Sequence, residues 1–226
     1  MAAITPSPQS HRTPQFTIYN NTADCIERAL VEDGHRTWGF VIYRCTYSDD
    51  AAWTRLLQTL TQHTHDTLKY YNGLDLINGN PFNFQLTVIE DRPFLDGVTT
   101  ATVRAHFKQW ATDAVAREQG GADKTPGLSQ RYRYCIRVDA AGLQSHAEEE
   151  DNEEDDRFVD LIWKDWEPSI PDPRERPEPA VEGCTRPDVG WMRVATRGLM
   201  VDMYDALRDQ NAWYSEYRRP DEVVCR

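Results

Sequence analysis

The sequence predicts an α+β fold: a single domain with a mixed sheet of about five strands and helices packed on one face. Two observations lead to this prediction. In the first half of the chain, strand-like segments rich in β-branched and aromatic residues alternate with two long segments of helical periodicity. In the second half, three strand-like segments follow one another without a long helix between them, so at least some of these strands must be antiparallel.

The first predicted strand is WGFVIYRCT, residues 38–46, a nearly continuous apolar run typical of a buried central strand. SDDAAWTRLLQTLTQH (48–63) follows as a helix, with an apolar face at the spacing i, i+3, i+4, i+7. FQLTVIED (84–91) is the second predicted strand, and residues 99–119 form the second helix. The order strand, helix, strand is typical of a right-handed βαβ unit, which makes these two strands parallel.

Three further strands are predicted at RYRYCIRVD (131–139), RFVDLIWKDW (157–166) and WMRVATRGL (191–199). A closing helix at 201–217 ends before Pro220. The predicted organisation is a disordered N-terminal tail (1–15) and one α+β domain (16–226). That domain carries an acidic insertion (145–157) and a Pro-rich loop (167–189).

Charge narrows the class of partner. The net charge is −12, and the run EEEDNEEDD at 148–156 holds eight of the acids, so the remainder is only mildly acidic. Nucleic acid and anionic membrane surfaces are therefore not expected as partners, because both require clustered Lys and Arg. A phosphate- or RNA-binding role for the alternating Arg131, Arg133 and Arg137 is disfavoured for the same reason.

The expected compartment is the cytoplasm or the nucleus. The five cysteines are scattered and odd in number, which fits a reducing environment. The first residues contain no apolar core of a secretory signal, and no apolar stretch reaches 18 residues. The sequence contains no Gly-rich phosphate loop, GxSxG or HExxH, and it indicates no particular cofactor.

One acidic edge is a candidate site. If strands 38–46 and 84–91 are parallel, their carboxyl ends share an edge of the sheet, where ligands favour binding. The candidates for catalysis as general acid or base are Asp49, Asp50, Glu90, Asp91 and Arg92. The candidates for a Mg²⁺ or Mn²⁺ site are Asp49, Asp50, Glu90 and Asp96.

Helix capping explains the same residues and is the favoured interpretation. Ser48 would cap the first helix and place both following aspartates in its first turn, where the helix dipole stabilises negative charge. Thr99 or Asp96 would cap the second helix. Arg92 would pair with Asp91 or Glu90 and neutralise the edge.

Several segments together resemble a large family of small proteins from filamentous fungi. They are FVIYRCTYSDDAAW, VIEDRPFLDG, RYRYCIRVD, EGCTRPDVGWMRVATRGL and DQNAWYSEYRRPDEV, so the resemblance extends from about residue 37 over nearly the whole chain. It implies one compact unit in which residues 182–192 belong to the fold. No biochemical activity is established for that family, so the resemblance implies no catalytic residue.

The leading functional hypothesis is an intracellular, non-catalytic binding or regulatory module whose partner is a protein. Trp213, Tyr214 and Tyr217 would form an anchor at the interface if exposed, or pin the last helix to the sheet if buried, which is the favoured alternative. The competing hypothesis is a small-molecule enzyme, or an accessory protein of a fungal biosynthetic pathway, that uses the acidic edge. A pocket at that edge would favour the enzyme, and salt bridges filling it would favour the module.

Overall fold

The computed structural model describes residues 20–79, 81–147, 157–168, 170, 174, 176–220 and 222–225. The predicted tail at 1–15 and the acidic run at 148–156 lie outside these ranges.

A six-stranded mixed sheet forms the centre of the molecule, in the order β4–β2–β5–β6–β7–β8. Its strands are β2 (Val41–Arg44), β4 (Thr87–Ile89), β5 (Tyr134–Val138), β6 (Phe158–Trp163), β7 (Trp191–Ala195) and β8 (Val223–Val224). β4 and β5 both pair with β2 in parallel, β6 is antiparallel to β5 and β7, and β8 is parallel to β7. A small parallel sheet of β1 (Thr37–Trp38) and β3 (Asn83–Phe84) precedes the β2–β4 pair.

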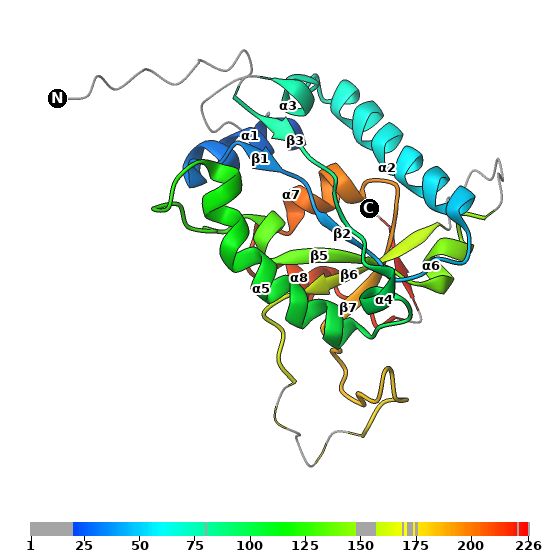
Figure 1. Ribbon diagram of the computed structural model, residues 1–226. Helices are drawn as coiled ribbons and strands as arrows, with labels where there is room; N and C mark the ends of the chain where they lie inside the picture. Colours follow the sequence, from blue (N-terminus) through cyan, green and yellow to red (C-terminus); the bar gives the residue numbers. More distant parts are fainter. Residues whose placement is uncertain are drawn as a thin grey trace.

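Helices cover both faces of the sheet, with α2 on one side and α5 on the other (Figure 1). The long helices are α1 (Thr22–Asp33), α2 (Asp50–Tyr70) and α5 (Thr100–Gln119). The short ones are α3 (Asp75–Asn78), α4 (Arg92–Leu95), α6 (Ala140–Gln144), α7 (Tyr204–Ala206), α8 (Ala212–Glu216), the 3₁₀ turn η1 (Gln130–Tyr132) and the π-helical turn η2 (Leu199–Met203).

The α+β class is confirmed, and the two strands flanking α2 are parallel as predicted. The sheet has six strands because the two-residue β8, too short to show a pattern, pairs with β7. The expectation of helices on one face needs correction. The connection through α2 leads from β2 to β4, and the connection through α5 leads back across β2 to β5, so crossovers of one hand place the two helices on opposite faces.

The predicted closing helix at 201–217 is interrupted. Residues 199–206 form η2 and α7, and α8 begins only at Ala212. Between them the Asp209 carboxylate accepts a hydrogen bond from the backbone N–H of Asn211 at 2.8 Å. Such a local turn competes with continued helix, which explains the break.

The end of the Pro-rich loop belongs to the fold. Val189, the last residue of the loop, is buried next to Trp191 and Met192, which begin β7 and are buried too. The Arg219 guanidinium donates to the backbone carbonyl of Cys184 at 3.2 Å and also to those of Pro179 and Arg186. These three hydrogen bonds attach residues 179–186 to the C-terminal segment.

Candidate functional site

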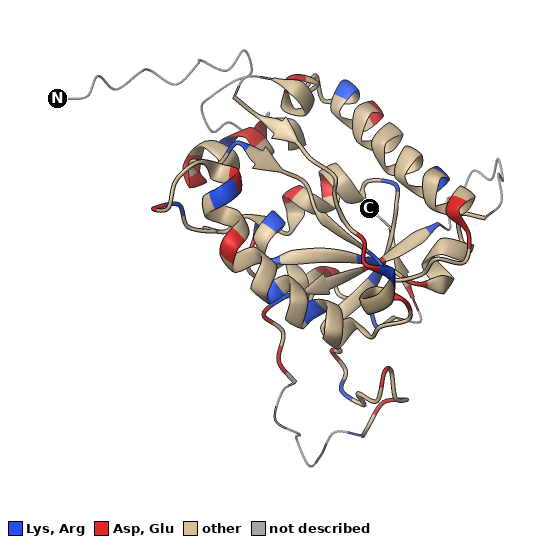
Figure 2. Cartoon of the chain, viewed as in Figure 1, with Lys and Arg blue, Asp and Glu red and all other residues tan. Residues whose placement is uncertain are grey.

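The structure brings the carboxyl ends of β2 and β4 together, as the parallel pairing predicts. The backbone N–H of Asp91, just after β4, donates to the hydroxyl of Tyr47, just after β2, at 3.1 Å. Acidic and basic segments lie side by side at this edge, next to α4 (Figure 2). The acidic edge predicted from the sequence is therefore present.

Arg44 occupies this edge and offsets part of its negative charge. Its guanidinium forms ion pairs with Asp50 and, at 3.4 Å, with Glu90. The side chain is buried, and its guanidinium lies 4.6 Å from the ring centre of Tyr47 and 5.0 Å from that of Trp53. Sequence reasoning missed Arg44, although an arginine inside the apolar run VIYRC needs a carboxylate partner when buried.

Asp49, and not Ser48, is the N-cap of α2. Its carboxylate accepts from the backbone N–H of Ala52 at 2.9 Å, and Asp50 is the first helical residue. The predicted cap was one residue early: Ser48 Oγ lies 3.3 Å from Thr46 Oγ1 instead. Asp49 therefore has a structural partner.

Arg92 does not neutralise Glu90 or Asp91, contrary to expectation. Its nearest carboxylate partner is Asp96, at 3.9 Å, one helical turn further on. Both side chains are about half exposed or more, so this pair contributes little to stability. Thr99, the other predicted cap, does cap α5 by accepting from Thr102 N–H at 3.4 Å.

The metal candidates do not converge on one point. Within the described ranges, no three His, Cys, Asp or Glu side chains are grouped so that they could hold a metal ion. Asp49 binds a backbone amide, Asp50 and Glu90 bind Arg44, and Asp96 faces Arg92.

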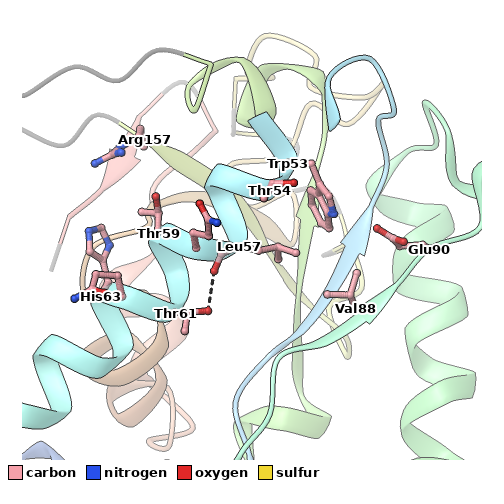
Figure 3. Close-up of a pocket in the computed structure, with 11 residues that line it drawn as sticks. Trp53, Thr54, Leu57, Thr59, Thr61, His63, Val88, Glu90 and Arg157 are labelled. Carbon is pink, nitrogen blue, oxygen red and sulfur yellow. Dashed lines mark hydrogen bonds between the residues drawn. The ribbon is translucent and has the colours of Figure 1, made fainter. Parts of the chain in front are cut away.

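A groove of about 1020 Å³ follows α2 beside this edge and extends from β4 to Arg157. We call it the α2–β4 groove; it is lined by Trp53, Thr54, Leu57, Gln58, Thr59, Thr61, Gln62, His63, Val88, Glu90 and Arg157. Figure 3 shows Trp53 and Leu57 of α2 facing Val88 and Glu90, whereas Thr59, His63 and Arg157 lie on the other side of the helix. The part between α2 and β4 thus has an apolar floor beside the Glu90 carboxylate, and Thr, Gln, His63 and Arg157 side chains border the remainder.

A second charged cluster lies deeper in the sheet. Arg137 of β5 is buried and donates to Asp160 of β6 at 2.9 Å and to Glu182 at 2.7 Å, with Asp139 at 3.3 Å. Burial raises the pKa of the Asp160 carboxyl to about 7, although Arg137 opposes that shift. Glu182 also accepts from the backbone N–H of Thr100 at 3.0 Å, so the cluster joins the sheet, α5 and the Pro-rich loop.

Two of the three alternating arginines of segment 131–139, Arg131 and Arg137, do not form a free surface. Arg131 is fully buried and forms a bidentate pair with Glu118, with both contacts at 2.7 Å. Arg137 is committed to the cluster just described. These two guanidiniums fasten elements of the fold together.

The C-terminal aromatics divide between core and surface. Trp213 is fully buried, and its indole N–H donates to Asp188 at 2.9 Å, so it pins α8 to the Pro-rich loop. The Tyr217 hydroxyl accepts from Val189 N–H at 3.1 Å. Only Tyr214, 68% exposed, presents its ring to solvent, so the three do not form one exposed anchor.

The buried thiols are not activated nucleophiles. Burial raises the pKa of the Cys45 thiol to about 12, and burial raises that of Cys135 as well. Both therefore stay protonated at neutral pH, whereas a nucleophilic cysteine requires the thiolate.

No helix among the described residues combines the length and apolarity needed to cross a membrane.

Comparison with known proteins identified no relative of this chain. No protein-family model matches the chain, and searches of curated proteins and of solved structures found no match.

Proposed function

We propose that the protein is an intracellular, non-catalytic binding module whose partner is another protein and whose binding surface is the α2–β4 groove. The observation that carries this proposal is the position of Arg44. It pairs with Asp50 and Glu90, so two of the carboxylates that an acid–base or metal site would need already have a cationic partner.

The groove supports a protein partner by its composition. Trp53, Leu57 and Val88 provide an apolar centre, and exposed Thr and Gln side chains of α2 provide a polar rim. Protein interfaces have the same organisation, with an apolar core inside a polar border. The proposed interface does not include the C-terminal aromatics, of which only Tyr214 is exposed.

Peptide selection tests this proposal because it does not require the partner to be identified first. A library of displayed random peptides is panned against the immobilised full-length protein, and selected peptides are measured against two variants. Leu57→Gln changes the groove while keeping a good helix former. Tyr214→Ala removes the exposed aromatic ring of α8, which does not line the groove. Peptides that lose binding with Leu57→Gln alone support the groove, and peptides that lose binding with Tyr214→Ala alone refute it.

The competing proposal is a small-molecule enzyme, or an accessory protein of a fungal biosynthetic pathway, with a metal site at the acidic edge. It is favoured by one observation: Glu90 is 46% exposed and lines the groove. Thermal-shift titration with Mg²⁺, Mn²⁺, Ca²⁺ and Zn²⁺, with an EDTA control, separates the two. Saturating metal at about 100 times Kd adds about 2.7 kcal/mol. Such a shift, lost in Asp49→Asn/Glu90→Gln, would support the enzyme.

A further inference from the structure

β4 is an open edge of the central sheet. It is the terminal strand, and within the described part of the chain its outer side has no paired strand. None of residues 84–89 is buried, whereas all four residues of β2, its neighbour on the inner side, are buried.

Among the described residues, alternate backbone groups along the outer side of this edge have no strand to pair with. The N–H groups of Asn83 and Gln85 donate inward, to the carbonyls of Arg36 at 2.8 Å and Trp38 at 2.9 Å. In a parallel ladder the residues that bond one neighbour alternate with residues whose N–H and C=O point the other way. Leu86 and Val88, which occupy the alternate positions, therefore direct their backbone groups outward.

The edge also lacks the usual protection against pairing. Residues 84–89 read FQLTVI, with no charge, proline or glycine. Exposed edge strands normally carry a charge, a proline or a bulge, because an unprotected apolar edge recruits other strands. The unprotected edge of β4, next to an apolar groove, is therefore suited to pair with a strand from a binding partner.

Side chains and charge indicate what that strand looks like. Phe84, Leu86 and Val88 face α2 and pack against the core beneath it, so a neighbouring strand would place every second side chain over the α2–β4 groove. At the end of β4, the acids Asp50, Glu90, Asp91 and Asp96 outnumber the two cations Arg44 and Arg92. A positive charge on the incoming strand is favoured there.

We propose that the partner contributes an extended segment that adds to the outer edge of β4 as a further strand. Alternate apolar side chains of the segment enter the α2–β4 groove, and a Lys or Arg lies beside Glu90. This inference rests on the proposed function and specifies its partner by backbone pairing and charge.

The first test changes the edge backbone. Val88→Pro removes an N–H that the sheet does not use, and proline is tolerated at such edge positions. Val88→Thr, the matched control, keeps the N–H and the β-branched shape. Both variants alter the same groove side chain, so they are compared with each other. For peptides selected on the groove, Val88→Pro is expected to bind about tenfold more weakly than Val88→Thr, the loss expected for about one hydrogen bond.

The second test uses the unmodified protein, so it does not depend on how a variant folds. Each backbone amide of a selected peptide is N-methylated in turn. A strand bonded along one edge should lose about tenfold in affinity at every second position only. Glu90→Gln should weaken peptides that carry Lys or Arg, and this effect should shrink at high salt.

The outcomes separate the two proposals. Peptides that depend on Leu57 but ignore both Val88→Pro and the methylation pattern would overturn strand addition while leaving the groove as the binding surface. A library that yields no groove-dependent peptide would overturn the proposed function itself. A homodimer in solution that Val88→Pro dissociates would identify a second copy as the occupant and overturn the assignment to a basic partner segment.

Discussion

Arg137→Met is expected to lower the free energy of unfolding by about 3–5 kcal/mol, the loss typical of breaking a buried ion pair. Arg137 is 4% exposed, and Asp160, its partner at 2.9 Å, is 1% exposed. Methionine replaces much of the apolar stem, so the loss arises mainly from the carboxylate left behind. One oxygen of Asp160, Oδ1, already lacks a hydrogen-bond partner.

The double variant Arg137→Met/Asp160→Leu should recover most of this stability. Well-packed apolar side chains often replace a buried ion pair at little cost, whereas an uncompensated buried charge is expensive. Glu182, 26% exposed, can be hydrated when it loses Arg137. A double variant as unstable as the single one would show that the loss comes from packing.

The loss in Arg137→Met should grow with pH. Burial raises the pKa of Asp160 and Arg137 opposes this, so removing Arg137 raises the pKa further. A carboxyl whose folded pKa exceeds its unfolded value stabilises the fold most below the unfolded pKa, and that stability is lost as pH rises through the folded pKa. The variant should therefore be closer to wild type at about pH 5 than at about pH 8.

Urea unfolding of wild type, single variant and double variant at both pH values measures these differences. A loss under about 1 kcal/mol at the higher pH would refute the argument for a buried, Arg-dependent carboxylate. A loss that is greater at the lower pH would refute the assigned direction of the Asp160 pKa shift.

Two further substitutions, each with a neighbouring control, test the capping and packing assignments by urea unfolding. Asp49→Ala should cost about 1 kcal/mol because it removes the N-cap of α2, and Ser48→Ala should stay within about 0.5 kcal/mol. The reverse order would restore Ser48 as the cap. Trp213→Ala should cost about 3–5 kcal/mol because it empties a buried site, and Tyr214→Ala about 0.5 kcal/mol or less. Equal losses would contradict the division of these aromatics between core and surface.

The sequence predicted the acidic edge correctly because the pattern of two buried strands around an amphipathic helix implies parallel pairing. It did not reveal Arg44 as the neutralising cation, because the partners Asp50 and Glu90 lie on two different elements. Arg92, adjacent in sequence to the acids, was the natural choice, yet α4 directs it toward Asp96. Ion pairs between elements distant in sequence depend on how the strands are aligned with one another, and the hydrophobic periodicity of the sequence does not give this alignment.

The two covered faces could have been predicted. If β4 pairs with one side of β2 and β5 with the other, the two connections run in opposite directions across the sheet. Because both crossovers are right-handed, their helices then lie on opposite faces. By contrast, the burial of Trp213 and the exposure of Tyr214 depend on the orientation of α8, a helix of only five residues. Such a helix is too short to show a periodic apolar face. The cluster of Arg137, Asp160 and Glu182 likewise joins three segments that no local pattern connects.

The position of β2 between β4 and β5 has a consequence for synthesis on the ribosome. β2 ends at Arg44, but its second neighbour is complete only at Val138, about ninety residues later. At about 5–20 residues per second, roughly 5–20 seconds separate the two. During that interval one side of β2, all four residues of which are buried in the folded protein, has no partner strand. Translation speed over residues 45–138 therefore sets how long this strand is open to chaperones and to wrong partners.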